Sequence, residues 1–595
     1  MKHLAALNKY FLKYKWRLLA GIFFVICANA LNVCTPYITG QAVTLISKNI
    51  ATLTTNGPTA TLSEETISND VLWLFIKYLA VALMAGAFTF LMRQMIIVVS
   101  RLIEFDMKNE IYDHYQQLDL AFYRKNNTGD LMNRITEDVS RVRMYIGPAI
   151  MYTVNLFFTI VFAVSFMLYM DKELTLYVLI PLPILSVLIY FVNEKIEAAS
   201  TKIQAKLSDL TTNAQETYSG IRVVQAYTRE QEMLKHFDQE SEIYKQKQLN
   251  LAKIDAIYFP SMTFLIGLSI IIVVYMGGLH VGARKIDVGV LTSFLGFVNM
   301  LMWPVSSLGW TASLIQRAAA SQKRINEFLH HEPSVKENGG LDREIKGSIA
   351  FDHVSFTYPD TGIQALKDVS FKLKPGERIA IIGRTGSGKT TIADLLMRMY
   401  DVSSGKIFVD GAEIKDYNLR SLRRQVGFVP QDVFLFSETI TENISFGLEK
   451  SDKELATRYA HYASIGREIE DFPLGYETMV GERGVTLSGG QKQRISIARA
   501  LIKQPNVLLL DDSLSAVDTA TEKQIQQNLD EVLANKTAII ITHRIFSLIH
   551  FDNILVLDNG TIAEQGTHDE LLRKGGIYAD IYEKQLSEQT QQEAA

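Results

Sequence analysis

The sequence RIAIIGRTGSGKTT, residues 378–391, decides the fold of the C-terminal half of the chain. Four apolar residues after Arg378 predict a buried strand, and a helical pattern begins at Thr391. The spacing between them, G-x-x-x-x-G-K-T, is typical of a phosphate-binding loop, whose glycines let backbone N–H groups face the phosphates. The sequence therefore predicts nucleotide binding by Gly383, Arg384, Thr385, Gly386, Ser387, Gly388, Lys389, Thr390 and Thr391.

The same half carries a second element of such a site. In this motif Lys389 reaches the β- and γ-phosphates of ATP, and Thr390 holds Mg²⁺. The apolar run at 507–510 ends in Asp511, which we expect at the carboxyl end of a strand as a second Mg²⁺ anchor. Short apolar runs alternate with helical patterns from residue 349 onward, which predicts a cytosolic α/β P-loop ATPase domain with a largely parallel sheet.

The N-terminal half has a different composition. Over all 595 residues, 48% are apolar and 21% are charged, and the mean hydropathy is +0.09, which is too apolar for an ordinary soluble enzyme. Apolar stretches long enough to cross a bilayer lie only before residue 310. They predict a polytopic α-helical membrane domain of six spans, at about 18–37, 71–99, 145–170, 174–192, 258–279 and 288–308.

Basic residues predict the orientation of these spans. The connections 1–17, 100–144 and 193–257 hold 21 Lys and Arg, against 4 in the alternate connections. The positive-inside rule then places both termini and the ATPase domain in the cytoplasm, with the spans in the cell membrane. The two long cytoplasmic connections have helical composition with one break each, at 126–130 and 217–220, which predicts two extended helical hairpins.

Composition excludes several other classes of protein. A net charge of −4 gives no sign of a nucleic-acid partner, and only two cysteines, Cys27 and Cys34, exclude a disulfide scaffold. The predicted domains are a transmembrane domain at 1–320, a linker at 321–348, an ATPase domain at 349–586 and a polar tail at 587–595.

The pentapeptide LSGGQ lies between the phosphate loop and Asp511. It resembles the signature of ATP-binding-cassette (ABC) transporters, and the order of motifs along the chain resembles a half-size ABC exporter. In that family the signature of one chain acts on the ATP bound by the other chain of a dimer. The resemblance assigns this role to Leu487, Ser488, Gly489, Gly490 and Gln491.

The resemblance implies roles for four further residues. Tyr358 matches the aromatic residue that stacks on adenine, and Gln431 matches the glutamine that approaches Mg²⁺ and the attacking water. Asp518 belongs to the stretch that resembles the D-loop. His543 matches the switch histidine that contacts the γ-phosphate, and it is a candidate catalytic residue together with Gln431.

The chain departs from the family at Asp512, where a catalytic glutamate normally stands. Aspartate has the same charge but is one methylene shorter, and a displacement of about 1 Å can cost about a hundredfold in rate. Chains with this aspartate and an intact signature often form the weaker half of a heterodimer. A slow homodimer, in which Asp512 is the catalytic residue, stays open because Gln431 and His543 are present.

The resemblance implies ATP-driven export of an amphiphilic substrate, such as a drug, a lipid or a peptide, by a dimer in contact with membrane lipid. The alternative is a non-pumping ABC-type channel or regulator. Polar residues within the spans, among them Asn29 and Asn155, either line a cavity or form hydrogen bonds between helices.

Overall fold

The computed structural model describes residues 2–56, 64–336, 340–481, 484, 486–514, 517, 519–544 and 551–593. Two compact units make up the chain. The first contains residues 1–115 and 129–331, and the second contains residues 116–128 and 332–595. Residues 116–128, which interrupt the first unit along the chain, therefore pack as part of the second unit.

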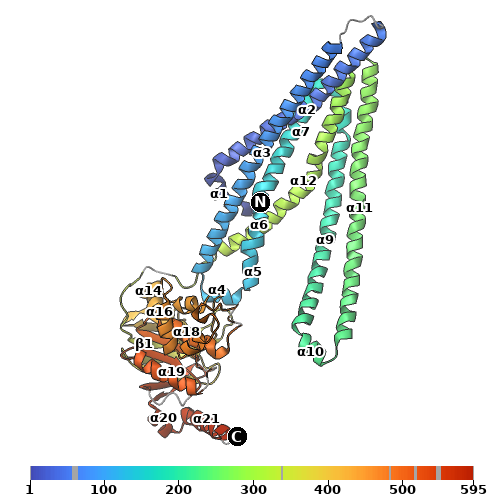
Figure 1. Ribbon diagram of the computed structural model, residues 1–595. Helices are drawn as coiled ribbons and strands as arrows, with labels where there is room; N and C mark the ends of the chain where they lie inside the picture. The colour runs from blue at the N-terminus through green and yellow to red at the C-terminus, as the bar shows by residue number, and fades with distance from the viewer. Residues whose placement is uncertain are drawn as a thin grey trace. The chain divides into compact units, whose positions relative to one another are not determined.

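The first unit is helical (Figure 1). Its long helices are α2 (Lys15–Asn56), α3 (Glu64–Gln117), α7 (Ile150–Met170), α9 (Pro181–Ser219), α11 (Glu230–Gly282) and α12 (Val288–Leu329). The shorter ones are η1 (Lys2–Leu7), α1 (Asn8–Lys13), α5 (Thr128–Asn133), η3 (Arg134–Asp138), α6 (Val139–Met144), η4 (Tyr145–Ala149), α8 (Lys172–Leu179) and α10 (Ile221–Ala226).

Five helical segments are long and apolar enough to cross a membrane: Lys15–Ile50, Asn69–Gln117, Thr128–Met170, Thr263–Gly282 and Val288–Leu329. They overlap five of the six predicted spans. The predicted span at 174–192 falls on α8 and α9, which meet at Ile180 just before Pro181, and it is not among the five segments found in the described residues. The count of six spans stays a prediction.

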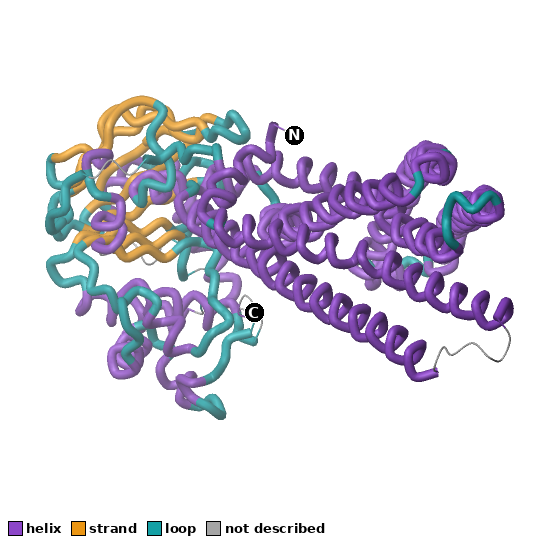
Figure 2. The backbone as a smooth tube through the Cα atoms, turned by 90° about the horizontal axis from the view of Figure 1, so that it is seen from above, coloured by secondary structure: helices purple, strands orange, loops and turns teal. Residues whose placement is uncertain are grey.

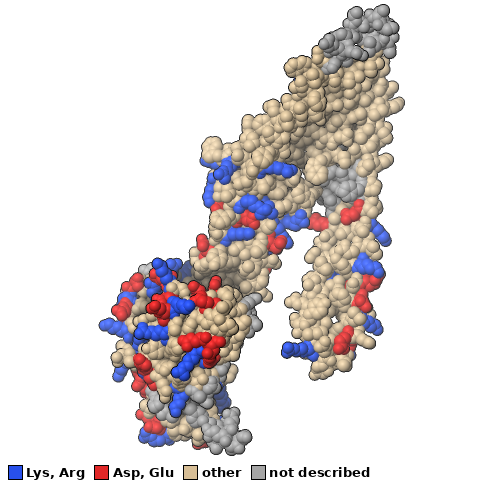
Figure 3. All heavy atoms as spheres, in the orientation of Figure 1, with Lys and Arg blue, Asp and Glu red and all other residues tan. Residues whose placement is uncertain are grey.

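The surface of the first unit fits a lipid environment. Large apolar side chains of α3 are exposed, including Trp73 at 63% and Leu83 at 66%. On the face shown in Figure 3, charged side chains are nearly absent from the part of the helical unit farthest from the tip of the α9–α11 hairpin and gather toward that tip. Exposed apolar surface of this extent is costly in water and favourable in a bilayer.

A polar cluster joins α2 to α7 inside the first unit. The side-chain amide of Asn29 donates to Oδ1 of Asn155 at 2.9 Å, and the Thr159 hydroxyl donates to Oδ1 of Asn29. Asn29 is 2% exposed and Thr159 is 3% exposed. Of the two readings of these asparagines, the structure favours hydrogen bonds between helices, because such groups are costly to leave unpaired in an apolar core.

The hairpin of α9 and α11 extends away from the other helices of its unit and turns through α10 (Figure 1). The break predicted at 217–220 is found there, because α9 ends at Ser219 and α10 begins at Ile221. Several large side chains at this tip are exposed: Tyr218 at 75%, Val223 at 62% and Tyr227 at 73%.

The second unit has two sheets that lie together and are flanked by helices (Figure 2). A six-stranded sheet has the order β10-β9-β3-β8-β7-β6, and an antiparallel sheet has the order β2-β1-β4-β5. The strands are β1 (Ile349–Thr357), β2 (Gln364–Leu373), β3 (Arg378–Gly383), β4 (Ser404–Val409), β5 (Ala412–Glu413), β6 (Val426–Val429), β7 (Val507–Asp511), β8 (Thr537–Ile541), β9 (Asn553–Asp558) and β10 (Thr561–Gly566).

All neighbouring strands from β9 to β6 in the larger sheet are parallel, as predicted, and only β10 runs antiparallel to β9. The helices of this unit are α4 (Leu120–Lys125), α13 (Lys389–Leu396), η5 (Ile414–Asp416), α14 (Leu419–Gln425), α15 (Ile440–Ser445), α16 (Lys453–Tyr462), α17 (Gly466–Glu470), η6 (Gly475–Glu477), α18 (Gly489–Leu501), α19 (Thr519–Val532), α20 (His568–Lys574) and α21 (Ile577–Glu593).

Candidate active site

The carboxyl ends of β3, β7 and β8 meet at one pocket of about 880 Å³. Parallel strands that lie side by side place the residues that follow them at the same edge of the sheet, where open α/β sheets bind their ligands. The predicted residues that line this pocket are Tyr358, Gly383, Arg384, Thr385, Gly386, Gly388, Lys389, Thr390, Thr391, Gln431, Asp511, Asp512 and His543. Ser387 is in the same loop, and its side chain is buried.

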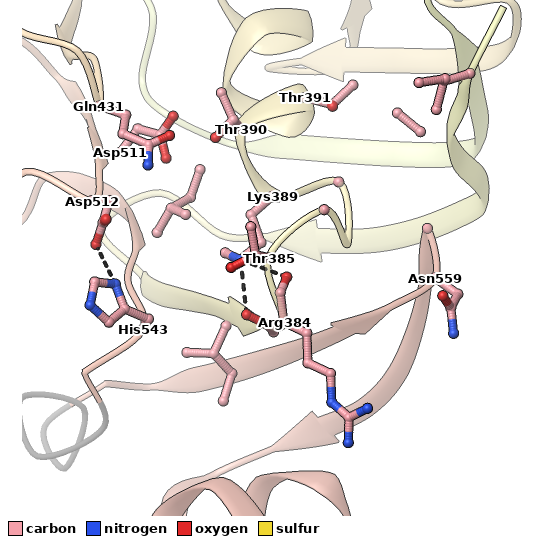
Figure 4. A pocket seen from close by; sticks show the side chains of 18 of the residues that line it. Arg384, Thr385, Lys389, Thr390, Thr391, Gln431, Asp511, Asp512, His543 and Asn559 are labelled. Carbon is pink, nitrogen blue, oxygen red and sulfur yellow. Dashed lines mark hydrogen bonds and ion pairs between the residues drawn. The ribbon is translucent and has the colours of Figure 1, made fainter. Parts of the chain in front are cut away.

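The phosphate loop links β3 to α13 through a tight turn. Gly388 precedes α13 with φ of +102°, and a Cβ atom there would lie 2.5 Å from the carbonyl oxygen of Ala365. Only glycine fits this close approach without strain. The ammonium group of Lys389 donates to the carbonyl oxygens of Gly383 and Arg384 at 2.9 and 3.0 Å (Figure 4). These hydrogen bonds fix the lysine side chain against the backbone of the phosphate loop.

The charges of the pocket are of both signs. Burial lowers the pKa of Lys389, and the nearby carboxylates of Asp512 and Asp511 oppose this shift. Burial raises the pKa of Asp511 to about 6, and the charge of Asp512 adds to this effect. The pocket is thus lined by one ammonium group and two close carboxylates. A polyphosphate would neutralise the ammonium group, and a divalent cation would neutralise the carboxylates.

Buried oxygen atoms in the pocket are suitable ligands for a cation. Both carboxylate oxygens of Asp511 and the hydroxyl of Ser387 are buried, and none has a hydrogen-bond partner in the described part of the chain. Buried polar atoms are rarely left unpaired, and oxygen donors suit Mg²⁺. Figure 4 shows Asp511, Gln431 and Thr390 on the same side of the pocket, so the residues present fit a magnesium ion.

Asp512 and His543 form a pair at the same edge (Figure 4). The Asp512 carboxylate lies 2.8 Å from Nδ1 of His543, and this contact raises the pKa of His543. Asp512 directly follows β7 and has φ of +47°, in the left-handed region that is rare for residues other than glycine. Backbone strain of this kind is often found at functional sites.

The LSGGQ residues lie apart from this pocket. Ser488 caps α18 in a reciprocal arrangement: its hydroxyl accepts from the backbone N–H of Gln491, and the Gln491 side chain accepts from the N–H of Ser488. Of the residues that the structure describes, none of Leu487, Ser488, Gly489, Gly490 and Gln491 lines the pocket. Asp518 lies outside the described residues.

Sequence reasoning missed several residues of the pocket wall, and two of them come from segments far from the motifs. Arg124 comes from α4, more than 250 positions before the phosphate loop, and Gln585 comes from α21. The Gln585 side chain donates to the carbonyl oxygen of His543. Neither residue belongs to a motif, so no local pattern could have identified them.

Comparison with known proteins agrees with this geometry. The family described as ABC transporter transmembrane region matches residues 18–305, and the family described as ABC transporter matches residues 366–515. The chain is 40% identical over 495 residues to the probable multidrug resistance ABC transporter ATP-binding/permease protein YheI of Bacillus subtilis, with 82% of this chain and 83% of YheI covered. The chain belongs to the ABC transporters.

Two further comparisons indicate which ABC transporters this chain is similar to. It is 36% identical over 486 residues to the ATP-dependent lipid A-core flippase of Pseudomonas aeruginosa, covering 81% of this chain and 80% of the flippase. The solved structure of a bacterial Atm1-family ABC exporter with ATP bound is 25% identical, with a TM-score of 0.78 over 96% of this chain and 98% of that chain. The transporter therefore has the exporter fold, binds ATP and couples its hydrolysis to transport across a membrane.

Proposed function

We propose that this chain is one half of a dimeric exporter that moves an amphiphilic substrate out of the cell. One observation carries the proposal: the pocket with Lys389, Asp511, Asp512 and His543 lies on the same chain as helices long and apolar enough to span a bilayer. The relatives named for multidrug resistance and lipid A-core transport support a drug or a lipid as the substrate class.

Asp512 and His543 carry the chemistry in this proposal. Asp512 accepts hydrogen bonds from the attacking water, and His543 holds the Asp512 carboxylate in place through their 2.8 Å contact. Lys389 compensates the charge on the phosphates. Mg²⁺, held by Thr390, Gln431 and Asp511, would neutralise further phosphate charge. Because the Asp512 carboxylate is short, we propose slow hydrolysis at this site.

A second chain completes the transporter. The N-terminus of α18, capped by Ser488, presents backbone N–H groups that suit a phosphate of the partner's ATP. The exposed tip of the α9–α11 hairpin, with Tyr218, Val223 and Tyr227, offers apolar surface that suits the ATPase domain of the partner. The partner is a second copy or a related half-transporter.

The membrane placement follows the charge pattern. We propose residues 1–320 as a transmembrane domain in the cell membrane and 349–586 as the ATPase domain, joined by the linker at 321–348 and followed by the polar tail at 587–595. Both termini and the ATPase domain then face the cytoplasm, in agreement with the 21 basic residues in the predicted cytoplasmic connections.

The test is ATP-dependent transport of a lipophilic fluorescent cation and of a labelled phospholipid in proteoliposomes. The Lys389→Ala variant is the matched control, and we expect it to lose both transport and hydrolysis. Transport that persists in Lys389→Ala would overturn the role of this site. Passive flux at the same rate with and without ATP turnover would instead indicate a channel.

A further inference from the structure

Arg124 connects the nucleotide pocket to a distant part of the sequence. It lies on α4, which packs with the second unit although its chain neighbours α3 and α5 extend into the first. Leu120 and Ala121 pack against the hydrophobic core that contains strands β1 to β4. This position is fixed by packing rather than by a flexible loop.

Asp119 fastens the start of α4. One of its carboxylate oxygens accepts from the backbone N–H of Phe122 at 3.1 Å, which caps the helix. The other accepts from both the backbone N–H and the hydroxyl of Ser334, in the segment that leads into β1. These hydrogen bonds lower the pKa of Asp119 against the effect of its burial, so the cap is charged at neutral pH.

The guanidinium of Arg124 lies among aromatic rings at the pocket wall. Its central carbon is 5.1 Å from the centre of the Tyr358 ring and 5.7 Å from that of Tyr400. The two rings are perpendicular and 5.5 Å apart. The Tyr358 hydroxyl is 2.9 Å from the hydroxyl of Thr391 on α13, so this tyrosine is tied to the helix that follows the phosphate loop.

The negative partner of Arg124 is only loosely engaged. The Arg124 Nη2 atom lies 3.7 Å from Oδ2 of Asp394, a distance longer than a hydrogen bond. That oxygen and the Tyr400 hydroxyl are buried without a hydrogen-bond partner among the described residues. Arg124 is therefore held mainly by ring faces and by charge, and its side chain is still 40% exposed.

We propose that Arg124 is a base-binding residue, which contacts the purine of the nucleotide together with Tyr358. This proposal rests on the ATP site proposed above and adds a contact from outside the phosphate loop. Arg124 and Tyr358 line the same pocket as Lys389, so a base placed against the Tyr358 ring lies within reach of the guanidinium. A planar guanidinium stacks on aromatic surfaces and donates hydrogen bonds to ring nitrogens, whereas a lysine ammonium does not stack.

The proposal predicts that Arg124 contacts the base of ATP and not its phosphates. Arg124 should strengthen the binding of ATP but not the binding of inorganic tripolyphosphate, which has no base. A role limited to holding α4 in place would affect neither ligand selectively. A general effect of positive charge would affect both ligands, because both carry the same type of anionic chain.

The experiment measures the dissociation constants of ATP and tripolyphosphate for the full-length chain in lipid nanodiscs. The variants are Arg124→Ala and Arg124→Lys, and Lys125→Ala is the matched control, since it removes the same charge from the neighbouring exposed position of α4. We expect Arg124→Ala to weaken ATP binding by about three- to tenfold and to leave tripolyphosphate binding unchanged. Arg124→Lys should recover less than half of this loss, and Lys125→Ala should resemble the wild type.

Three outcomes would overturn the inference alone. Two of them concern Arg124→Ala: an equal loss for ATP and tripolyphosphate, or no loss for either. A wild-type chain that binds tripolyphosphate but shows no preference for ATP would also overturn it. A wild-type chain that binds neither ligand would overturn the proposed ATP site and this inference with it. The melting temperature of each variant, with and without ATP, separates loss of the contact from loss of folding.

Discussion

Lengthening the carboxylate at position 512 should accelerate ATP hydrolysis. Asp512 ends in a carboxylate that lies 2.8 Å from Nδ1 of His543, at the edge of the pocket beyond β7. Asp512→Glu adds one methylene, which extends the reach of the carboxylate by about 1.5 Å at most. A misplacement of about 1 Å can change a rate by about a hundredfold, so we expect an increase between about tenfold and a hundredfold.

The assay is the release of phosphate at saturating ATP by the purified transporter in lipid nanodiscs. Asp512→Asn is the matched control, because it keeps the size of the side chain and removes its charge, and we expect it to be slower than the wild type. Lys389→Ala sets the background. The affinity for ATP should change less than threefold between the aspartate and the glutamate, since in the proposed mechanism position 512 contacts the reacting water rather than the base.

An unchanged or lower rate in Asp512→Glu, with ATP binding intact, would refute the idea that side-chain length limits turnover. In that case the aspartate, held by its contact with His543, would already be placed correctly for hydrolysis. Loss of activity in Asp512→Asn would then still identify Asp512 as the group that accepts the hydrogen bond from water.

Three further outcomes follow from the described contacts. Lys389→Ala should reduce hydrolysis at least about a hundredfold, measured as phosphate release, because it removes the cation of the phosphate loop. Asn29→Ala should lower the free energy of unfolding by about 1 kcal/mol in a detergent melt and leave the affinity for substrate unchanged, because Asn29 joins α2 to α7. Burial raises the pKa of Asp394 to about 6, so ionisation of Asp394 costs stability that is fully lost once the pH exceeds 6. Asp394→Asn should therefore raise the melting temperature at pH 8, with a gain in the free energy of unfolding of up to about 3 kcal/mol. This gain should shrink as the pH falls from 6 to below 4, where Asp394 becomes protonated in both the folded and the unfolded chain, and a lower melting temperature at pH 8 would contradict it.

The phosphate site could be predicted from sequence because its geometry is local. The spacing of Gly383, Gly388 and Lys389 fixes a turn between a strand and a helix, and that turn decides where the backbone N–H groups point. Asp511 was predictable for a similar reason, since a buried parallel strand delivers the next residue to the ligand-binding edge of the sheet.

Other features depend on packing between distant segments. Arg124 reaches the pocket only because α4 packs with the second unit, and no periodicity near residue 124 indicates this. The hydrogen bond between Asn29 and Asn155 depends on the pairing of α2 with α7, which a single sequence does not specify. By contrast, the break between α8 and α9 at Ile180 has a local cause, which a hydropathy pattern does not reveal. Pro181 has no N–H group to continue the hydrogen bonds of α8.

The choice between a homodimer and a heterodimer follows from two features that act on different ATP molecules. In the proposed dimer, Asp512 serves the ATP of its own pocket, whereas the N-terminus of α18, capped by Ser488, serves the ATP of the partner. A homodimer would combine two complete signatures with two short carboxylates, and both of its sites would be slow. A partner with a glutamate at the equivalent position would form one fast site from its own carboxylate and the signature of this chain. Turnover by the chain alone that rises in Asp512→Glu would therefore establish the homodimer. Negligible turnover by both the chain and its Asp512→Glu variant, with ATP binding intact, would establish the need for a different partner.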